Sequence, residues 1–438
     1  MQSLVRKLKD FIQPVADLFR TKTRDPVEQA SHYAGGLLGG THRKNMERME
    51  ETVPGSSKQN LQQFISDSPW SHEEVMDHAA LQAANFPGPH PDLSLLVDES
   101  CFTKKGNKSA GVARQWNGRL GKADNCQVGV FCSLNRGPHT AIIKASLYLP
   151  KAWAEDPERC LKAGVPEEEI KFRDKCEIAF EDIRETLAKG IRPGWVGVDA
   201  GYGKNAGFLQ RIEDELGMCF MADIPHNRRV WLERPDVENT PCRKLVGLGI
   251  KAPALAKNLG PGEWEKIRTR TGPGGHVEVM AWAKQVWVWS GRKKDAPRKW
   301  WLLLRRDKGG DTKYSLCNAP EGTEPGRLAF MAGQRYFVER AFEDGKTGVG
   351  MAQYQVRKWL GWQHHMAMVP LASFFLLKER VLAVEELPEV TIRDLVVVLR
   401  HMLPGRGIVS VDEDVITEKL LVRLRDKRRA SKTKINST

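Results

Sequence analysis

The segment WVGVDAGYG, residues 195–203, is an apolar run that ends in an acid and continues in small residues. Four apolar or small residues before Asp199 predict a short buried strand, and the glycines after it predict the strand's end. Helical periodicity precedes this strand over 172–190 and follows it around 208–212. Alternation of strands and helices is typical of α/β proteins.

Three further strands are expected upstream of this segment. Leu93 to Val97 forms a run that ends at Asp98, and β-rich runs follow at 127–134 (QVGVFCSL) and 140–149 (TAIIKASLYL). A last strand is expected at 219–224 (CFMADI). The resulting order from residue 91 is β-β-β-α-β-α-β.

Composition changes divide the chain into five parts. Residues 1–90 predict short helices separated by Gly35, Gly36, Gly39, Gly40 and the Pro54–Gly55 pair, with a capping pattern at Ser71 and Glu74. Such a bundle suits either DNA binding or plain packing. The first part of the α/β core spans 91–224, an antiparallel β-rich insertion 225–325, the second part of the core 326–385, and a helical region with a basic tail 386–438.

The bulk composition favours a globular protein with a polyanionic partner. The 438 residues are 41% hydrophobic and 28% charged, and the formal net charge is +13. Such a charge attracts phosphate polymers, although a basic surface alone does not establish DNA binding. The eight cysteines form no C-x-x-C pair, and no secretory signal or apolar run long enough to cross a bilayer is evident, so we expect a cytoplasmic protein.

Three acids stand where separate elements of the expected core could bring them together. If the strands ending at Asp98 and Asp199 are neighbours, both carboxylates emerge at one edge of the sheet, and Glu339 would join them from a helix after the insertion. Clustered carboxylates repel one another unless a hard cation neutralises them, and Mg²⁺ prefers oxygen ligands. Two such ions about 4 Å apart can support phosphodiester displacement. For any single acid, a turn or cap is the simpler interpretation.

Glu339 has a basic residue on either side along its expected helix. Arg335, Glu339 and Lys346 fall on one face at 100° per residue, so the two cations could hold phosphates beside a metal-bound carboxylate. An ordinary ion-paired helix face would have the same spacing between Arg335 and Glu339.

Several longer segments carry a family resemblance. LLVDES at 95–100, CFTKKGNKSAGVARQWNGRLGKADNCQVGV at 101–130, LYLPKAW at 147–153, WVGVDAGYG at 195–203 and RYFVERAFEDGKTGVGMAQYQVRKW at 335–359 resemble the DDE transposases of bacterial insertion sequences. Within these they are similar to the branch with a Y-R-E-K signature and a β-rich insertion before the catalytic Glu. The resemblance runs from about Leu95 to about Leu376.

The resemblance implies an RNase H-like catalytic core with Asp98, Asp199 and Glu339 as the catalytic, metal-binding triad. Arg335 and Lys346 match the Arg and Lys of the signature and would bind DNA. The signature's Tyr should stand seven residues before the Glu, where this sequence has Ala332; Tyr336 is near but out of register. In similar transposases an aromatic residue of the insertion stacks on a base flipped from the transposon end.

Other candidate DNA contacts come from composition. A loop after Asp98 carries six cations, which could hold DNA or simply be solvated: Lys104, Lys105, Lys108, Arg114, Arg119 and Lys122. Of the insertion's tryptophans, most are expected in the sheet core, and Trp300 or Trp301 is nominated for base stacking. The adjacent His364 and His365 point about 100° apart on a helix and are expected to be packed rather than to share a metal.

The expected function is therefore cut-and-paste DNA transposition. The enzyme would bind terminal inverted repeats, cleave a strand at each end with two Mg²⁺ ions, for which Mn²⁺ could substitute, and transfer the freed 3′ end to target DNA. Its partners would be double-stranded transposon and target DNA, and a homodimer would hold two ends together. A nucleoid-associated location is expected. The alternatives are an RNase H-like nuclease without strand transfer and a domesticated DNA-binding protein.

Overall fold

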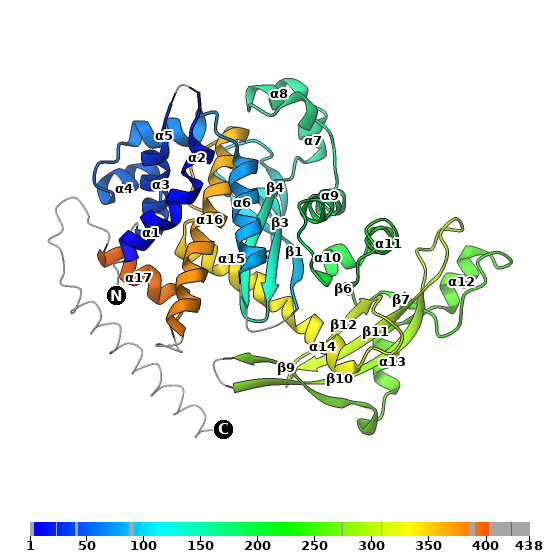
Figure 1. Cartoon of the computed structure of the whole chain (residues 1–438). Coiled ribbons are helices and arrows are strands. Elements are labelled where there is room, and N and C mark those ends of the chain that lie inside the picture. Colours follow the sequence, from blue (N-terminus) through cyan, green and yellow to red (C-terminus); the bar gives the residue numbers. More distant parts are fainter. Residues whose placement is uncertain are drawn as a thin grey trace.

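The structure is a computed structural model that describes residues 4–22, 24–39, 43–86, 92–118, 120–272, 275–307, 309–384, 390–402 and 422. Arg119, Gly40 and all but Val422 of the expected basic tail lie outside the described residues. A large mixed sheet with helices around it confirms the α/β class (Figure 1).

The N-terminal region is helical, as predicted. It consists of α1 (Leu4–Ile12), a 3-10 turn (Gln13–Val15), α2 (Ala16–Phe19), α3 (Val27–Gly39), α4 (Met46–Thr52), α5 (Lys58–Ser66) and α6 (His72–Asn85). The hydroxyl of Ser71 accepts a hydrogen bond from the Glu74 amide at 3.1 Å, so Ser71 caps α6 as expected. Helices α3, α5 and α6 pack on the long C-terminal helix α16 (Trp359–Val384), so the N-terminal region shares a core with the end of the chain (Figure 1).

Gly35 and Gly36 do not interrupt a helix, contrary to the prediction. Both lie buried inside α3, where Met49 of α4 packs against Gly36. A Cβ at position 36 would lie 2.4 Å from Cγ of Met49. The absence of a side chain therefore permits close approach of two helices, and this packing outweighs the low helix propensity of glycine.

The first part of the core sheet is formed by the strands that precede the insertion. Its first members are β1 (Ser94–Thr103), β2 (Ala113–Asn117), β3 (Lys122–Arg136), β4 (His139–Leu147), β5 (Trp195–Val198) and β6 (Phe220–Asp223). Strand β1 pairs antiparallel with β3 and parallel with β5, and β5 pairs parallel with β6. The strands that lead to Asp98 and Asp199 are thus neighbours, as is required for the two carboxylates to emerge at one edge of the sheet.

Helices cover both faces of this sheet. Between β4 and β6 lie α7 (Lys151–Ala154), α8 (Pro157–Lys162), a 3-10 turn (Glu167–Glu169), α9 (Lys175–Ala188), α10 (Ala200–Gly203) and α11 (Ala206–Asp214). Leu95 and Val97 of β1 pack in one apolar cluster with residues of α9 and α11, whereas Leu96 packs in another with residues of α14 (Pro325–Gln334) and α15 (Tyr336–Gly348). Because side chains alternate along a strand, Asp98 faces the same side as Leu96.

The insertion continues the core sheet rather than building a second large one. Its elements are β7 (Arg229–Val230), α12 (Cys242–Leu248), β8 (Ile250–Lys251), α13 (Ala252–Asn258), a 3-10 turn (Pro261–Glu263), β9 (Glu265–Gly272), β10 (Gly275–Val288), β11 (Arg298–Asp307) and β12 (Thr312–Cys317). Strand β12 pairs with β6, which gives the order β2-β3-β1-β5-β6-β12-β11-β10-β9, with β4 on β3. The alternating sequence over 276–288 lies on one long strand, β10.

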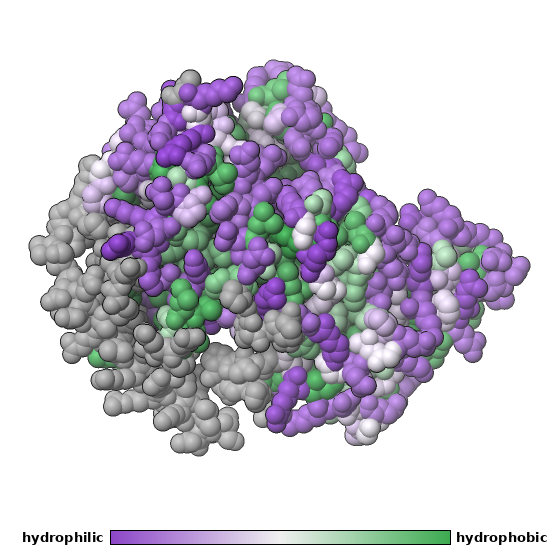
Figure 2. All heavy atoms as spheres, in the orientation of Figure 1, coloured by the Kyte–Doolittle hydropathy of each residue, from purple (hydrophilic) through white to green (hydrophobic). Residues whose placement is uncertain are grey.

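The final described elements are α16, whose residues are mostly buried, and α17 (Ile392–Met402). None of the described helices combines the length and apolar character needed to span a membrane. Hydrophilic residues cover most of the face shown in Figure 2, including the strands of the insertion.

Candidate active site

Asp98 and Asp199 lie side by side, at the point where the parallel pairing of β1 with β5 ends. The parallel register of β1 and β5 ends at Val97 opposite Val198, so the two acids occupy the next position on each chain. Asp98 Oδ1 accepts a hydrogen bond from the Glu99 amide at 2.7 Å. Asp199 caps α10, and its Oδ1 accepts hydrogen bonds from the amides of Gly201 and Tyr202 at 2.8 and 3.2 Å. Each carboxylate is therefore held by backbone on one oxygen.

The sequence suggested that the first strand ends at Asp98, but β1 continues beyond it. It continues to Thr103, because residues 99–103 stay paired with Gln127 and its neighbours on β3. Asp98 instead marks the point where β1 loses its other neighbour, β5.

Asp98 is partly buried, with 14% of its side chain exposed, and lies beside the like charge of Asp199. Burial, together with the Asp199 carboxylate, raises the pKa of Asp98 to about 7, and the positive charge of Arg335 opposes the rise. A buried acid with its pKa shifted by charge neighbours is a frequent mark of a functional site.

Arg335 links the carboxylates of three different elements. It stands at the junction of α14 and α15, with helical dihedral angles, and its guanidinium lies 3.6 Å from Asp98, 2.9 Å from Asp223 and 3.1 Å from Glu339. The Arg335–Glu339 ion pair that the spacing allowed is present. Asp98 and Asp223 extend it into a network, and these surrounding acids raise the pKa of Arg335 despite its burial.

Asp223 is the residue that reasoning from the sequence missed. It ends β6 on the same face as Met221, and besides Arg335 it accepts a hydrogen bond from Ser315 of β12 at 2.7 Å. A signal was available, since the expected strand at 219–224 carries an acid, Asp223, next to its last residue. The four carboxylates thus come from β1, β5, β6 and α15.

Lys346 lies two turns beyond Glu339 on α15. Its ammonium is 6.0 Å from the centre of the Phe342 ring. Burial raises the pKa of the Cys101 thiol on β1, and Lys346 is one of the charges that oppose this rise. Lys346 is therefore near the part of β1 that continues past Asp98.

The cations of the loop after Asp98 are not equivalent. Lys105, Lys108, Arg114 and Lys122 are exposed. Lys104 is partly buried, with its ammonium 3.4 Å from the centre of the Tyr354 ring, and burial lowers its pKa to about 8. Between Arg114 and Lys122, Trp116 on the edge strand β2 is 59% exposed, and the sequence had not singled it out.

The two nominated tryptophans differ in their surroundings. Trp300 is buried, packs edge-on against Phe220 and donates its indole N–H to Glu213, so it has no face available to a base. Trp301 is partly exposed and donates to the carbonyl of Pro320 at 3.1 Å. His364 and His365 are both fully buried and packed: both ring nitrogens of His364 contact backbone carbonyls, and His365 bonds Tyr33 at 2.8 Å.

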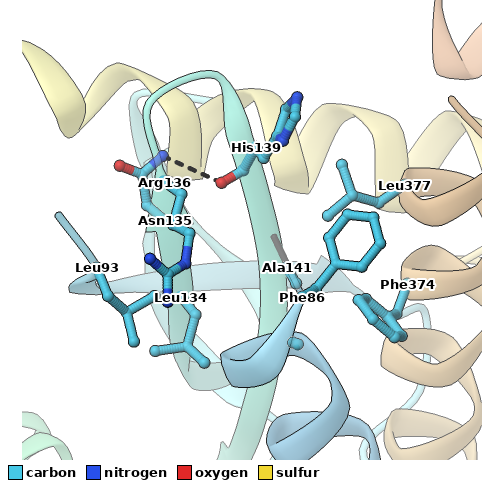
Figure 3. Close-up of a pocket in the computed structure, with 10 residues that line it drawn as sticks. Phe86, Leu93, Leu134, Asn135, Arg136, His139, Ala141, Phe374 and Leu377 are labelled. Atoms are coloured by element: carbon cyan, nitrogen blue, oxygen red, sulfur yellow. Dashed lines mark hydrogen bonds between the residues drawn. The ribbon is translucent and has the colours of Figure 1, made fainter. Parts of the chain in front are cut away.

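A pocket of about 100 Å³ adjoins the network, between the insertion strands and the α14–α15 junction. Its lining includes Thr269, Arg305, Lys313, Arg335, Tyr336 and Glu339. A smaller hollow of about 20 Å³, shown in Figure 3, lies elsewhere, between Phe86, Leu134, His139, Phe374 and Leu377; its lining includes no acid. The larger pocket is the one beside the carboxylates.

The donor set is that of a hard-cation site. Carboxylate oxygens are the ligands that Mg²⁺ prefers, and the burial and mutual repulsion that raise the pKa of Asp98 are what a bound cation would relieve. Among the described residues no three or more His, Cys, Asp or Glu side chains are already close enough to form a metal cluster. Arg335 lies among these acids, and its positive charge offsets their negative charge.

A mixed sheet with acids at the ends of adjacent parallel strands, and a third acid on a covering helix, is compatible with the RNase H-like core of DNA-cutting enzymes. The chain belongs to the DDE superfamily endonucleases, whose family model matches residues 14–286. This match includes Asp98 and Asp199 and ends before Glu339. Endonucleases of this superfamily generally depend on divalent metal ions.

A transposase is among the similar proteins. The chain is 30% identical over 200 residues to the probable transposase for insertion sequence element IS701 of Microchaete diplosiphon, across 44% of this chain and 48% of that protein. It therefore spans about half the length of that relative. Both comparisons are consistent with a DDE transposase of an insertion sequence.

Proposed function

We propose that this protein is a cut-and-paste DNA transposase, which binds the terminal inverted repeats of its element, cleaves a strand at each end and transfers the freed 3′ end to target DNA. The observation that carries the proposal is the placement of Asp98 beside Asp199 in adjacent parallel strands, with Glu339 reaching the same network through Arg335. Membership of the DDE endonucleases and the similarity to a transposase support it.

Asp98, Asp199 and Glu339 would hold two Mg²⁺ ions, for which Mn²⁺ can substitute. Bound there, the ions would activate water or a 3′ hydroxyl and neutralise charge on the scissile phosphate. The backbone bonds to Asp98 and Asp199 fix one oxygen of each acid, and the other oxygen of Asp98 lies 3.6 Å from Arg335. Arg335 and Lys346 would bind phosphates beside the triad from the same helix.

The DNA would also contact the loop and hairpin that follow Asp98. Exposed Lys105, Arg114 and Lys122 would bind phosphates, with Trp116 between them as an aromatic surface. Lys104 would support this region through its packing on Tyr354. The N-terminal helices would recognise the terminal repeats, and a homodimer would hold two ends in one complex, in the bacterial cytoplasm where the nucleoid lies.

The test is a joining assay. A labelled duplex carrying the end of the element is incubated with a target plasmid and Mg²⁺, and wild type is compared with Asp199→Asn and Glu339→Gln. Glu343→Gln is the matched control, because Glu343 lies one turn further along α15 and pairs with Arg340 instead. We expect cut and joined products from wild type and Glu343→Gln, and neither from the two triad variants.

Two other results would redirect the proposal. Cut ends without joined products would identify a nuclease of the same fold. Binding of the end duplex without any cutting by wild type would identify a domesticated DNA-binding protein. Undiminished cutting by Glu339→Gln would contradict the assigned triad.

A further inference from the structure

A row of polar side chains crosses one face of the sheet from the core into the insertion. The row begins with Asp98 on β1, Asp199 after β5 and Asp223 on β6. Ser315 of β12 lies opposite Asp223, and two positions back along β12 Lys313 lies opposite Arg305 of β11. The row therefore changes from acidic to basic where the core strands meet the insertion strands.

Arg305 is unusual among the arginines of this surface because it is only 8% exposed. Its Nε has no hydrogen-bond partner, and no ion pair joins it to a carboxylate among the described residues. Burial of Nε without a hydrogen-bond partner is costly, and no carboxylate of the described residues neutralises the guanidinium, so this group is expected to meet an anion that enters the pocket from outside the chain.

The pocket beside the active site is where that anion would be accommodated. Arg305 and Lys313 line it from the insertion, and Arg335 lines it from the catalytic helix. Its two carboxylates already have cationic partners, since Asp307 lies 3.6 Å from Lys313 and Glu339 lies 3.1 Å from Arg335. Arg335 is also shared with Asp98 and Asp223, so Arg305 is the cation of this lining that has no carboxylate partner among the described residues.

We propose that Arg305 forms a binding subsite for a phosphodiester group of the DNA strand that is being cut, one that lies beside the phosphate at the triad. This inference rests on the proposed function. Guanidinium groups bind phosphate oxygens through paired N–H donors, and a buried one does so with little competition from water. The subsite lets the insertion position the strand with respect to Glu339.

Arg306 provides a matched control within the same strand. Adjacent residues of a strand face opposite sides, so Arg306 points away from the pocket. Its Nε donates to Thr312 Oγ1 at 3.2 Å, and its guanidinium lies 4.5 Å from the centre of the Trp264 ring. Arg305 and Arg306 are adjacent in sequence and carry the same charge, but only Arg305 faces the pocket beside the candidate active site.

The experiment measures affinity for the end duplex by fluorescence anisotropy across a series of salt concentrations, without divalent metal so that no cutting occurs. Arg305→Met keeps the length of the side chain and removes the charge, Arg305→Lys keeps the charge, and Arg306→Met is the control. For Arg305→Met we expect about tenfold weaker binding and a slope of log K against log salt reduced by about 0.9, which corresponds to one lost phosphate contact. Arg305→Lys should restore most of the slope, and Arg306→Met should retain all of it.

Replacement of single phosphates by methylphosphonates identifies the contact on the DNA. One substitution near the cut site should weaken wild type and Arg306→Met but should have no further effect on Arg305→Met. Wild-type affinity, slope and methylphosphonate pattern in Arg305→Met would overturn the inference. Thermal melting shows whether each variant is folded; Arg305→Gln replaces Arg305→Met if the latter is not.

The two proposals fail in distinguishable ways. If wild type neither cuts nor joins the end duplex, the proposed function fails. If wild type cuts and joins, and Arg305→Met does so with the same efficiency and affinity, only the Arg305 subsite fails.

Discussion

Arg335 donates from its Nε to the carboxylate of Asp223 at 2.9 Å, across 112 residues of sequence. This bond leaves the terminal nitrogens of the guanidinium directed toward Asp98 and Glu339. Asp223 in turn accepts from Ser315, so a residue of the insertion supports the position of the arginine. The geometry of this arginine therefore depends on β6 and β12, two strands that carry none of the proposed triad residues.

Replacement of Asp223 by Asn should slow DNA cutting about tenfold, which corresponds to about 1.4 kcal/mol. The loss of one charge-assisted hydrogen bond would free the Arg335 side chain to leave its position. The rate of single-turnover cleavage at saturating DNA is the measurement, with affinity for the end duplex measured in parallel. Ser315→Ala, which removes only the supporting bond, should have a smaller effect. Equal rates in wild type and Asp223→Asn would show that Asp223 does not position Arg335.

Replacement of Trp116 by Ala should weaken binding of the end duplex, because base stacking on an aromatic ring contributes about 1–3 kcal/mol. Its exposure and basic neighbours make it the best-placed tryptophan for DNA contact in the described hairpin. Phe172→Ala is the control, since Phe172 is an exposed aromatic residue outside the candidate site. Trp301→Ala is measured in parallel, because Trp301 was nominated for base stacking from the sequence. Equal affinities for Trp116→Ala and Phe172→Ala would exclude stacking at Trp116.

Alanine substitutions at the adjacent glycines Gly35 and Gly36 of α3 should have different effects on the free energy of unfolding. A Cβ at Gly36 would overlap Met49, whereas a Cβ at Gly35 would lie 4.0 Å from Val53. Gly36→Ala should lower the free energy of unfolding by about 1–3 kcal/mol through overpacking. Gly35→Ala should change it little or raise it by up to about 1 kcal/mol through helix propensity. Urea unfolding measures both, and a stabilising Gly36→Ala would contradict the packing described for α3 and α4.

Asp182 of α9 should make stability depend on pH. It is buried and accepts a hydrogen bond from Ser146 at 2.7 Å, and burial raises its pKa to about 7, with Lys144 opposing the rise. Between the ordinary value of 3.8 and about 7 the unfolded chain releases this proton while the folded chain keeps it. The contribution of Asp182 to the free energy of unfolding therefore falls as pH rises through this window and is constant above it.

The measurement for Asp182 is urea unfolding of wild type and Asp182→Asn at several values of pH from 4 to 8. The variant cannot titrate, so its stability relative to wild type should increase with pH by up to about 1.4 kcal/mol per unit within the window. Ser146→Ala leaves the acid in place and should retain the pH dependence. A constant difference between wild type and Asp182→Asn across the range would show that Asp182 does not titrate as described.

The parts of the fold that sequence patterns predicted are those with local signals. Strand β5 and helix α9 have continuous apolar runs or helical spacing because their residues are buried against neighbours close in the chain. Helix α14 begins at Pro325, next to the expected boundary between the insertion and the second part of the core at 326. The polar pair Lys284 and Gln285 does not interrupt β10, because both residues remain paired with β11, opposite Leu302 and Trp301.

The candidate acids could be nominated from the sequence, but the contacts that join them could not. Asp98, Asp199 and Glu339 follow from motif and spacing, and the pairing of β1 with β5 supports the proximity of the first two. The bond from Arg335 to Asp223 and the burial of Arg305 depend on the pairing of β12 with β6, which no local pattern specifies. Trp300 illustrates the same limit, because two adjacent tryptophans on a strand point to opposite faces and only tertiary packing decides which is buried.

The pairing of β6 with β12 bears on how such a chain could gain or lose its insertion. In a chain cut back to the core, the outer side of β6 would become a bare sheet margin, with backbone amides and carbonyls that the insertion now satisfies. Margins of that kind recruit strands from other molecules and lead to aggregation. Shortened descendants of this protein should therefore retain at least β12, or carry another segment in its place, even where every residue of the DNA-cutting chemistry lies outside the insertion.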